Sequence, residues 1–281
     1  MSRTDSNSRQ PFNIVRIQPR GQPASGAHAD VARLLYHSFE SLSHPVALQV
    51  NTCEVNAINI LIGCERMATP AFSKDVRYIP YQLEQLARGG VAISSSMMTI
   101  MQGAMEVWDY DPSNIEVLKQ IGIKSARLLP LGYHEKLMTI QRRADEDIDV
   151  LFYGLLNPRR QAIIDALKDK STVKTLQFVY GEERDKWIAR AKIVLNMHFY
   201  PAQIAEQVRV SYLLNNAKCV VSEQSDHDPL GHLCAVAPYD RLTETCMKLL
   251  ADRDERERII AAAHDGFRQM PMTGNLRAVL K

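Results

Sequence analysis

The sequence has 281 residues, of which 46% are apolar, and this is enough to build two hydrophobic cores. Its 34 basic and 32 acidic residues leave a formal net charge of +2, so nothing in the charge balance favours a nucleic-acid or membrane-surface partner. Five cysteines without a Cys-x-x-Cys pair indicate reduced thiols, and no apolar run approaches the roughly 18 residues of a membrane-spanning helix. We therefore expect a cytoplasmic protein without a transmembrane segment.

Short strand-like and helical segments alternate along the first half of the sequence. Residues 1–10 are mostly Ser, Asn, Arg and Gln, so we predict a disordered tail there. Asp111 followed by Pro112 is typical of a helix start, because Asp caps the free amide groups and Pro fits the first turn. Residues 11–133 form one predicted domain, with strands at 12–17, 46–50, 58–62, 78–81, 106–110 and 126–131, helices at 27–42, 97–105 and 113–121, and a helix or turn at 82–88.

A segment containing Pro and Gly, 129–133, indicates the exit from this first domain. We predict a linker at 134–147 and a second domain at 148–281. Its expected strands are 149–153, 175–180, 192–195, 219–221 and 236–237, and its expected helices are 158–168, 182–191, 202–215, 242–251 and 255–270. Because strands and helices alternate in both halves, the sequence predicts an α/β protein with two Rossmann-like, doubly wound domains facing each other across a cleft.

Polar side chains gather near the ends of two predicted strands of the second domain. They are Asn196, His198, Glu206, Arg209 and Glu223. Ligands of an open parallel sheet bind outside the carboxyl ends of the strands, so we expect these residues to converge on one crevice. A carboxylate at the start of a helix on this edge, such as Glu206, can accept hydrogen bonds from both hydroxyl groups of a ribose. Structural roles stay open, since Glu206 can instead pair with Arg209 three residues further along the helix.

The turn from Gly154 to Arg160 places a glycine, Asn157 and Arg159 just before a predicted helix. Backbone amides, an Asn and a guanidinium group at a helix N-terminus suit a diphosphate. An ordinary turn with solvated arginines is the alternative. The sequence contains neither G-x-G-x-x-G nor G-x-x-x-x-G-K-[ST], which disfavours an NAD enzyme and a P-loop NTPase.

No bound metal is expected. Asp-x-Asp occurs at 109–111 and at 147–149, but the first is better explained as a helix cap and the second as a solvated acidic segment. Four other possible ligands match no zinc spacing: Cys219, His227, His232 and Cys234.

Two residues of the first domain are candidates for a catalytic base, His28 and Glu65. His28 begins the helix that follows the first strand, and Glu65 follows the strand at 58–62. The sequence does not rank them above Asp30, Glu54 and Glu84. A surface position is the alternative for each.

Several segments together resemble glycosyltransferases of the two-domain GT-B type: DVLFYG, NPRR, KIVLNMHFY, EQVRVSYLLNNAKCVVSE, VWDYDPSNIEVLKQIG and LLPLGYHEKL. The sequence resembles in particular bacterial glycosyltransferase-like proteins with a Glu-x-x-Arg helix and a VVSE strand, over about residues 106–223. The resemblance implies that the C-terminal domain binds a nucleotide-diphosphate sugar, that the N-terminal domain binds the acceptor, and that no metal or cofactor is essential.

The resemblance also implies roles for individual residues. Glu206 would hold the ribose, and Gly154 and Arg159 would lie near the diphosphate. Asn196 and His198 would line the donor pocket. The sequence departs from the family pattern eight residues after Glu206, where Leu214 replaces a second glutamate.

We therefore expect a metal-independent glycosyltransferase that moves a sugar from a nucleotide-diphosphate donor to an unknown acceptor. Two alternatives remain from the sequence alone. One is a non-catalytic binding or scaffold protein of the same fold, and the other is a nucleotide-sugar epimerase or hydrolase of that fold.

Overall fold

The computed structural model describes residues 9–19, 21, 26–67, 72–86, 90–143, 145–200 and 204–281. The predicted tail, residues 1–10, lies outside the described residues except for its last two. By its internal contacts the chain divides into two compact units. Unit 1 comprises Met1–Leu83, Ile93–Pro130 and Met272–Lys281, and unit 2 comprises Glu84–Ala92 and Leu131–Pro271.

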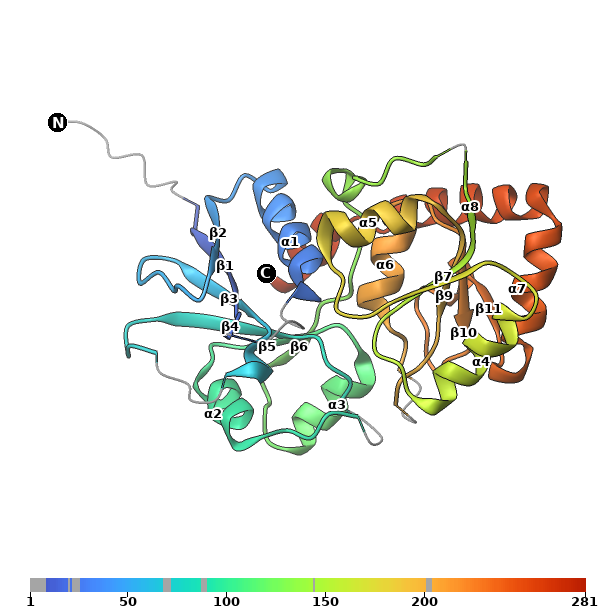
Figure 1. The fold of residues 1–281 in the computed structure, drawn as a ribbon. Coiled ribbons are helices and arrows are strands. Elements are labelled where there is room, and N and C mark those ends of the chain that lie inside the picture. Colours follow the sequence, from blue (N-terminus) through green and yellow to red (C-terminus); the bar gives the residue numbers. More distant parts are fainter. Residues whose placement is uncertain are drawn as a thin grey trace. The chain divides into compact units, whose positions relative to one another are not determined.

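Unit 1 is built on a parallel sheet with the strand order β2-β1-β3-β4-β5-β6 among the described residues (Figure 1). Its elements are β1 (Phe12–Arg16), α1 (Ala29–Ser41), β2 (Val46–Val50), β3 (Ile58–Ile62), β4 (Arg77–Gln82), α2 (Ser95–Gly103), β5 (Val107–Asp109), α3 (Pro112–Gln120), β6 (Ala126–Leu128) and α9 (Met272–Val279). The apolar face of α1 is buried through Val31, Leu34, Leu35 and Phe39. Helix α1 packs on β1, β2 and α9.

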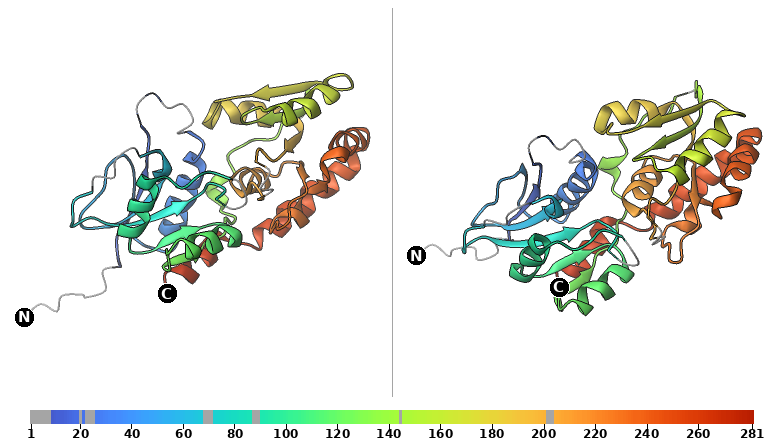
Figure 2. Two further views of the ribbon diagram at one scale, coloured as in Figure 1. Left: turned by 90° about the horizontal axis from the view of Figure 1, so that it is seen from below. Right: turned by 60° about the horizontal axis from the view of Figure 1, so that its bottom comes forward.

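Unit 2 has a second parallel sheet with the strand order β11-β10-β9-β7-β8 among the described residues. Its elements are β7 (Ile148–Tyr153), α4 (Pro158–Lys168), β8 (Val173–Leu176), α5 (Gly181–Ala189), β9 (Ala191–Asn196), α6 (Gln207–Asn215), β10 (Val220–Glu223), β11 (Ala235–Ala237), α7 (Leu242–Ala251) and α8 (Arg253–Arg268). Helices α4 and α7 contact each other, while α5 and α6 contact β9 (Figure 2).

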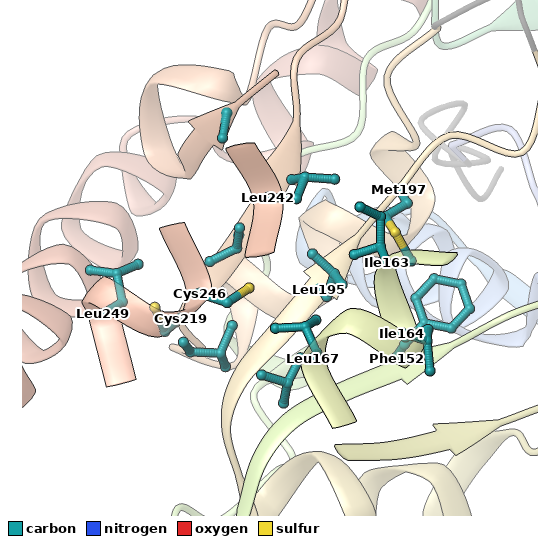
Figure 3. Packing of buried hydrophobic residues seen from close by; sticks show 14 of the residues in the cluster. Phe152, Ile163, Ile164, Leu167, Leu195, Met197, Cys219, Leu242, Cys246 and Leu249 are labelled. Carbon is teal, nitrogen blue, oxygen red and sulfur yellow. The ribbon is translucent and has the colours of Figure 1, made fainter. Parts of the chain in front are cut away.

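The core of unit 2 lies between its sheet and helices α4 and α7. Phe152 and Leu195 from the strands pack with Ile164 of α4 and Cys246 of α7, and all four are fully buried (Figure 3). Burying such apolar side chains stabilises the folded state by roughly 1.5–3 kcal/mol each. This core fixes the strands whose carboxyl ends carry the polar residues described below.

The predicted fold class is confirmed, since both units are α/β with Rossmann-like parallel sheets. Several predicted boundaries differ from the structure. Helix α6 begins at Gln207, so Ile204 and Ala205 are not helical, and residues 202 and 203 lie outside the described part. Of the helix or turn predicted at 82–88, residue 82 ends β4 and residues 83–86 form no helix, while residues 87 and 88 lie outside the described part. Strand β8 ends at Leu176, and Phe178 has a positive φ of 56°, which a continuing strand does not allow.

The sequence did not predict α9, and its position in unit 1 differs from the predicted second domain, 148–281. The helix is only eight residues long and contains a glycine, so its propensity is weak. Met272, Leu276 and Val279 are buried, and tertiary packing therefore stabilises the helix. Within the described residues, no helix combines the length and the apolar character needed to cross a membrane.

Candidate functional site

The sheet of unit 2 reverses its winding direction at β7 and β9. Strand β8 lies on one side of β7, and β9 followed by β10 lies on the other. The carboxyl ends of β7 and β9 therefore flank a topological switch point, which is where open α/β sheets bind their ligands. Gly154 follows β7, and Asn196 ends β9.

The guanidinium group of Arg209, in the first turn of α6, lies over Gly154. Gly154 has a φ of 137°, and a Cβ at this position would lie 2.8 Å from Arg209 Nη2. Arg209 Nη1 donates a hydrogen bond to Asn196 Oδ1 at 2.7 Å. Its Nε is buried and has no hydrogen-bond partner among the described residues. Arg209 thus places a positive charge and an unused hydrogen-bond donor, its Nε, at the switch point.

Glu206 lies between two arginines. One carboxylate oxygen accepts from Arg160 and the other pairs with Arg209. The Glu206 side chain is 15% exposed and precedes the first turn of α6. The intrahelical pairing considered as an alternative from the sequence is therefore present, and any ribose at Glu206 must compete with these arginines.

Arg160 connects the loops at this edge through hydrogen bonds. Its Nε donates to His198 O at 3.2 Å and its Nη1 to Leu155 O at 2.8 Å, while its Nη2 donates to Met197 O. Burial lowers the pKa of Arg160 to about 10, although the Glu206 carboxylate opposes this shift. The side chain is positioned for structure rather than for contact with a ligand. Its role was missed from the sequence, because nothing local distinguishes it from Arg159.

Arg159 forms a two-pronged ion pair with Glu223, the last residue of β10. Its guanidinium carbon also lies 3.8 Å from the centre of the Tyr239 ring. The Arg159 side chain is 36% exposed, whereas Glu223 is almost fully buried. Arg159 is thus the more accessible of the two neighbouring arginines, and Tyr239 is a contact that the sequence did not reveal.

Asn157 and His198 complete the polar cluster. Asn157 caps α4, accepting from Arg160 N at 2.9 Å, and donates to Phe199 O at 3.1 Å. The backbone N–H of His198 donates to Glu223 at 3.0 Å, and its imidazole Nε2 lies 3.1 Å from both Gln224 O and Ser225 Oγ. Seven of the eight residues predicted for the donor site therefore share one polar network, linked through Arg160, and the eighth, Gly154, lies next to Arg209.

The two candidate bases lie together in unit 1, at the carboxyl ends of β1 and β3. These neighbouring strands form the switch point of that sheet. His28 Nδ1 is 4.0 Å from Glu65 Oε1, and Glu65 also pairs with Arg66 at 3.0 Å. Burial lowers the pKa of His28 more than the Glu65 carboxylate raises it. A buried neutral imidazole next to a carboxylate can accept a proton from a hydroxyl group.

The Asp-x-Asp residues have structural partners. Asp111 caps α3 by accepting from Ser113 N at 2.8 Å, and Asp109 accepts from Asp111 N at 2.8 Å. Asp147 pairs with Arg190 and Asp149 with Lys192. These contacts account for all four carboxylates, and metal independence stays a prediction.

No protein-family model matches this sequence. Three uncharacterized proteins of Acanthamoeba polyphaga mimivirus are similar to it. The first is 27% identical over 173 residues, 57% of this chain and 56% of the relative. The second is 30% identical over 135 residues, 43% of this chain and 15% of the relative. The chain thus spans about half of the first relative and a small part of the second, and these viral relatives give no support for a bacterial origin.

Solved glycosyltransferase structures share the fold. An α-glucosyltransferase in complex with UDP and a 13-mer DNA has a TM-score of 0.63, with 7% identity over 97% of this chain and 100% of that chain. A glycosyltransferase from Rickettsia africae has a TM-score of 0.57, with 9% identity over 97% of both chains. AviGT4, a glycosyltransferase involved in avilamycin A biosynthesis, has a TM-score of 0.56, with 16% identity over 96% of both chains. The chain therefore has the fold of GT-B glycosyltransferases.

Proposed function

We propose that the protein is a glycosyltransferase that transfers a sugar from a nucleotide-diphosphate donor to an acceptor still to be identified, without a metal ion. The observation that carries the proposal is Arg209, held over Gly154 at the switch point of unit 2. The shared fold with nucleotide-sugar glycosyltransferases supports the same general activity. The five free cysteines are compatible with work in the cytoplasm.

In the proposed reaction, the bond between the sugar C1 and the diphosphate oxygen breaks, and a bond from C1 to an acceptor oxygen forms. Negative charge develops on the departing diphosphate. Arg209 and the more exposed Arg159 would stabilise that charge, which fixed cationic groups do well because they need no reorganisation. This is the role that a divalent metal ion has in other transferases.

Glu206 would exchange partners when the donor binds. A diphosphate attracts guanidinium groups strongly, so Arg209 can turn from Glu206 to the phosphate oxygens. The released carboxylate oxygen can then accept hydrogen bonds from the ribose hydroxyl groups. Asn196 and His198 would border the donor, and Gly154 and Asn157 would shape the turn beside the diphosphate.

His28 is proposed as the base that takes the proton of the acceptor hydroxyl group. Glu65 would orient the imidazole and stabilise its charged form. Such general-base catalysis contributes roughly 100- to 10,000-fold to the rate.

The proposal is tested by thermal unfolding with a panel of nucleoside diphosphates and nucleotide sugars. A ligand at about 100 times its Kd should stabilise the folded state by roughly 2.7 kcal/mol. We expect one nucleotide family to stabilise the wild type and to lose this effect in Arg209→Ala. The matched control is Arg268→Ala, an exposed arginine of the same unit. If no nucleotide raises the melting temperature of the wild type, the donor site and the transferase proposal fail.

A further inference from the structure

A charged cavity lies at the opposite edge of the unit 2 sheet. Its volume is about 430 Å³, and its lining residues are Arg142, Arg143, Glu146, Lys192, Arg253, Arg256 and Glu257. Glu146 precedes β7, Lys192 is near the start of β9, and Arg253 begins α8. The cavity is therefore at the amino ends of the strands, whereas the donor site is at their carboxyl ends.

Some of the basic side chains at this cavity have their own carboxylate partners. Arg143 pairs with Asp145 at 2.8 Å, and Lys192 pairs with Asp149 at 2.6 Å. These pairs cancel two positive charges. The net charge at the cavity is therefore set by the remaining residues.

One carboxylate, Glu146, serves two cations, and one cation, Arg142, serves two carboxylates. Arg142 pairs with both Glu146 and Glu257, and Glu146 also accepts from the buried Lys218 at 3.2 Å. The lining residues and their ion-pair partners Asp145, Asp149 and Lys218 together comprise six basic side chains and four carboxylates. This group of residues around the cavity carries an excess of two positive charges.

Arg253 and Arg256 carry this excess. Among the described residues, neither forms a salt bridge with a carboxylate. Arg256 is 7% exposed, and its Nη1 donates to Leu249 O and, at 2.9 Å, to Leu250 O at the end of α7. These bonds fix the guanidinium group in place. Arg253 and Arg256 are close enough to Glu257 to act on it, since their positive charges and that of Arg142 lower the Glu257 pKa.

We propose that this cavity binds the phosphate group of a small polar phosphate monoester. A phosphate monoester carries close to two negative charges at neutral pH, which matches the excess of two positive charges. Guanidinium groups bind phosphate oxygens through paired hydrogen bonds. The volume of 430 Å³ lies in the range of small-molecule sites, and the charged lining favours a hydrophilic body such as a sugar or a polyol. This site does not depend on the proposed transferase activity.

The test measures the binding of inorganic phosphate and glycerol 3-phosphate by titration calorimetry. We expect Arg253→Ala to weaken glycerol 3-phosphate binding roughly tenfold, since it removes a charged hydrogen-bond donor. Arg258→Ala is the matched control, because Arg258 is on the same helix, is 73% exposed and does not line the cavity. We expect it to bind like the wild type.

An Arg209→Ala background separates this cavity from the donor site. Binding at the cavity should persist there with the same sensitivity to Arg253→Ala. The proposal is overturned if the wild type does not bind either probe, if Arg253→Ala binds normally, or if Arg258→Ala weakens binding equally. Loss of all binding in Arg209→Ala alone would assign the phosphate to the donor site and also overturn it.

Discussion

Arg209 Nη2 lies 2.8 Å from the point where a side chain on Gly154 would begin. Gly154→Ala should therefore push the guanidinium group away from the switch point. The positive φ of 137° adds backbone strain of roughly 1–3 kcal/mol for a residue with a side chain. We expect lower stability in urea unfolding and no thermal stabilisation by nucleotides.

Gly122→Ala is the control that separates the effect of backbone strain from the steric clash with Arg209. Gly122 has a φ of 94°, but a Cβ there would meet nothing within 4 Å. We expect a similar loss of stability with normal nucleotide stabilisation. Normal nucleotide binding by Gly154→Ala would show that the position of Arg209 is not required.

Glu206→Gln should change ligand preference rather than abolish binding. The substitution removes the negative charge that holds Arg209, so the affinity for inorganic pyrophosphate should stay the same or increase. The wild type should prefer a nucleoside diphosphate over its 2′-deoxy form by roughly tenfold, because a ribose hydroxyl group donates to the carboxylate. This preference should disappear in Glu206→Gln. Calorimetry with both nucleotides measures it, and an unchanged preference would contradict the ribose role.

Asn157→Ala should lower stability by about 1 kcal/mol, because Asn157 caps α4. Asp252→Ala is the matched control, since Asp252 caps α8 by accepting from Glu255 N at 2.9 Å. Both variants should unfold at similarly lower urea concentrations. We expect only Asn157→Ala to weaken nucleotide binding, and equal binding by the two variants would limit Asn157 to a structural role.

Asp109 should make stability depend on pH. Burial raises the pKa of this carboxyl group despite hydrogen bonds from Asp111 N, Asn114 and Gln82. In the unfolded chain the pKa of this carboxyl group is about 3.9, so Asp109 keeps its proton to a higher pH in the folded state. The contribution of Asp109 is thus fully present below about pH 3.9 and declines as the pH rises through the folded pKa.

Urea unfolding at pH 4, 6 and 8 measures this contribution in wild type and Asp109→Asn. The variant lacks the titrating group, so its stability relative to the wild type should improve as the pH rises. A difference that stays constant across the three pH values would mean that the folded pKa of Asp109 is not raised.

His28→Gln should slow sugar transfer at least roughly 100-fold while leaving nucleotide stabilisation unchanged. Burial keeps the pKa of His28 below its ordinary value, so the imidazole is neutral and able to accept a proton at pH 7. Release of the nucleoside diphosphate from a labelled nucleotide sugar provides the assay. A variant with the wild-type rate would exclude His28 as the base.

Local patterns predicted much of the fold. Strands β2 and β3 and helix α7 have the predicted bounds, because short apolar runs and a regular helical spacing specify them without distant contacts. The gathering of Asn196, Glu206 and Glu223 followed from the parallel sheet alone. Their individual partners did not follow, since Arg160 bonds to carbonyl groups nearly forty residues away.

Tertiary contacts explain the remaining differences. Helix α9 has little helical propensity, and its contact with α1 joins segments from opposite ends of the sequence. The pairing of His28 with Glu65 likewise depends on β1 and β3 being neighbours, which chain order does not specify because β2 intervenes in sequence. The ranking of the candidate bases needed this geometry.

Arg160 makes part of the candidate site tolerant of evolutionary change. Three of its acceptors are backbone carbonyl groups, at Leu155, Met197 and His198, and a carbonyl persists whichever side chain its residue carries. A substitution at the exposed Leu155 therefore leaves its bond to Arg160 in place, whereas Met197 is buried in the core and the His198 imidazole has contacts of its own. Selection could therefore diversify the exposed part of this edge, provided that Arg160 itself is retained.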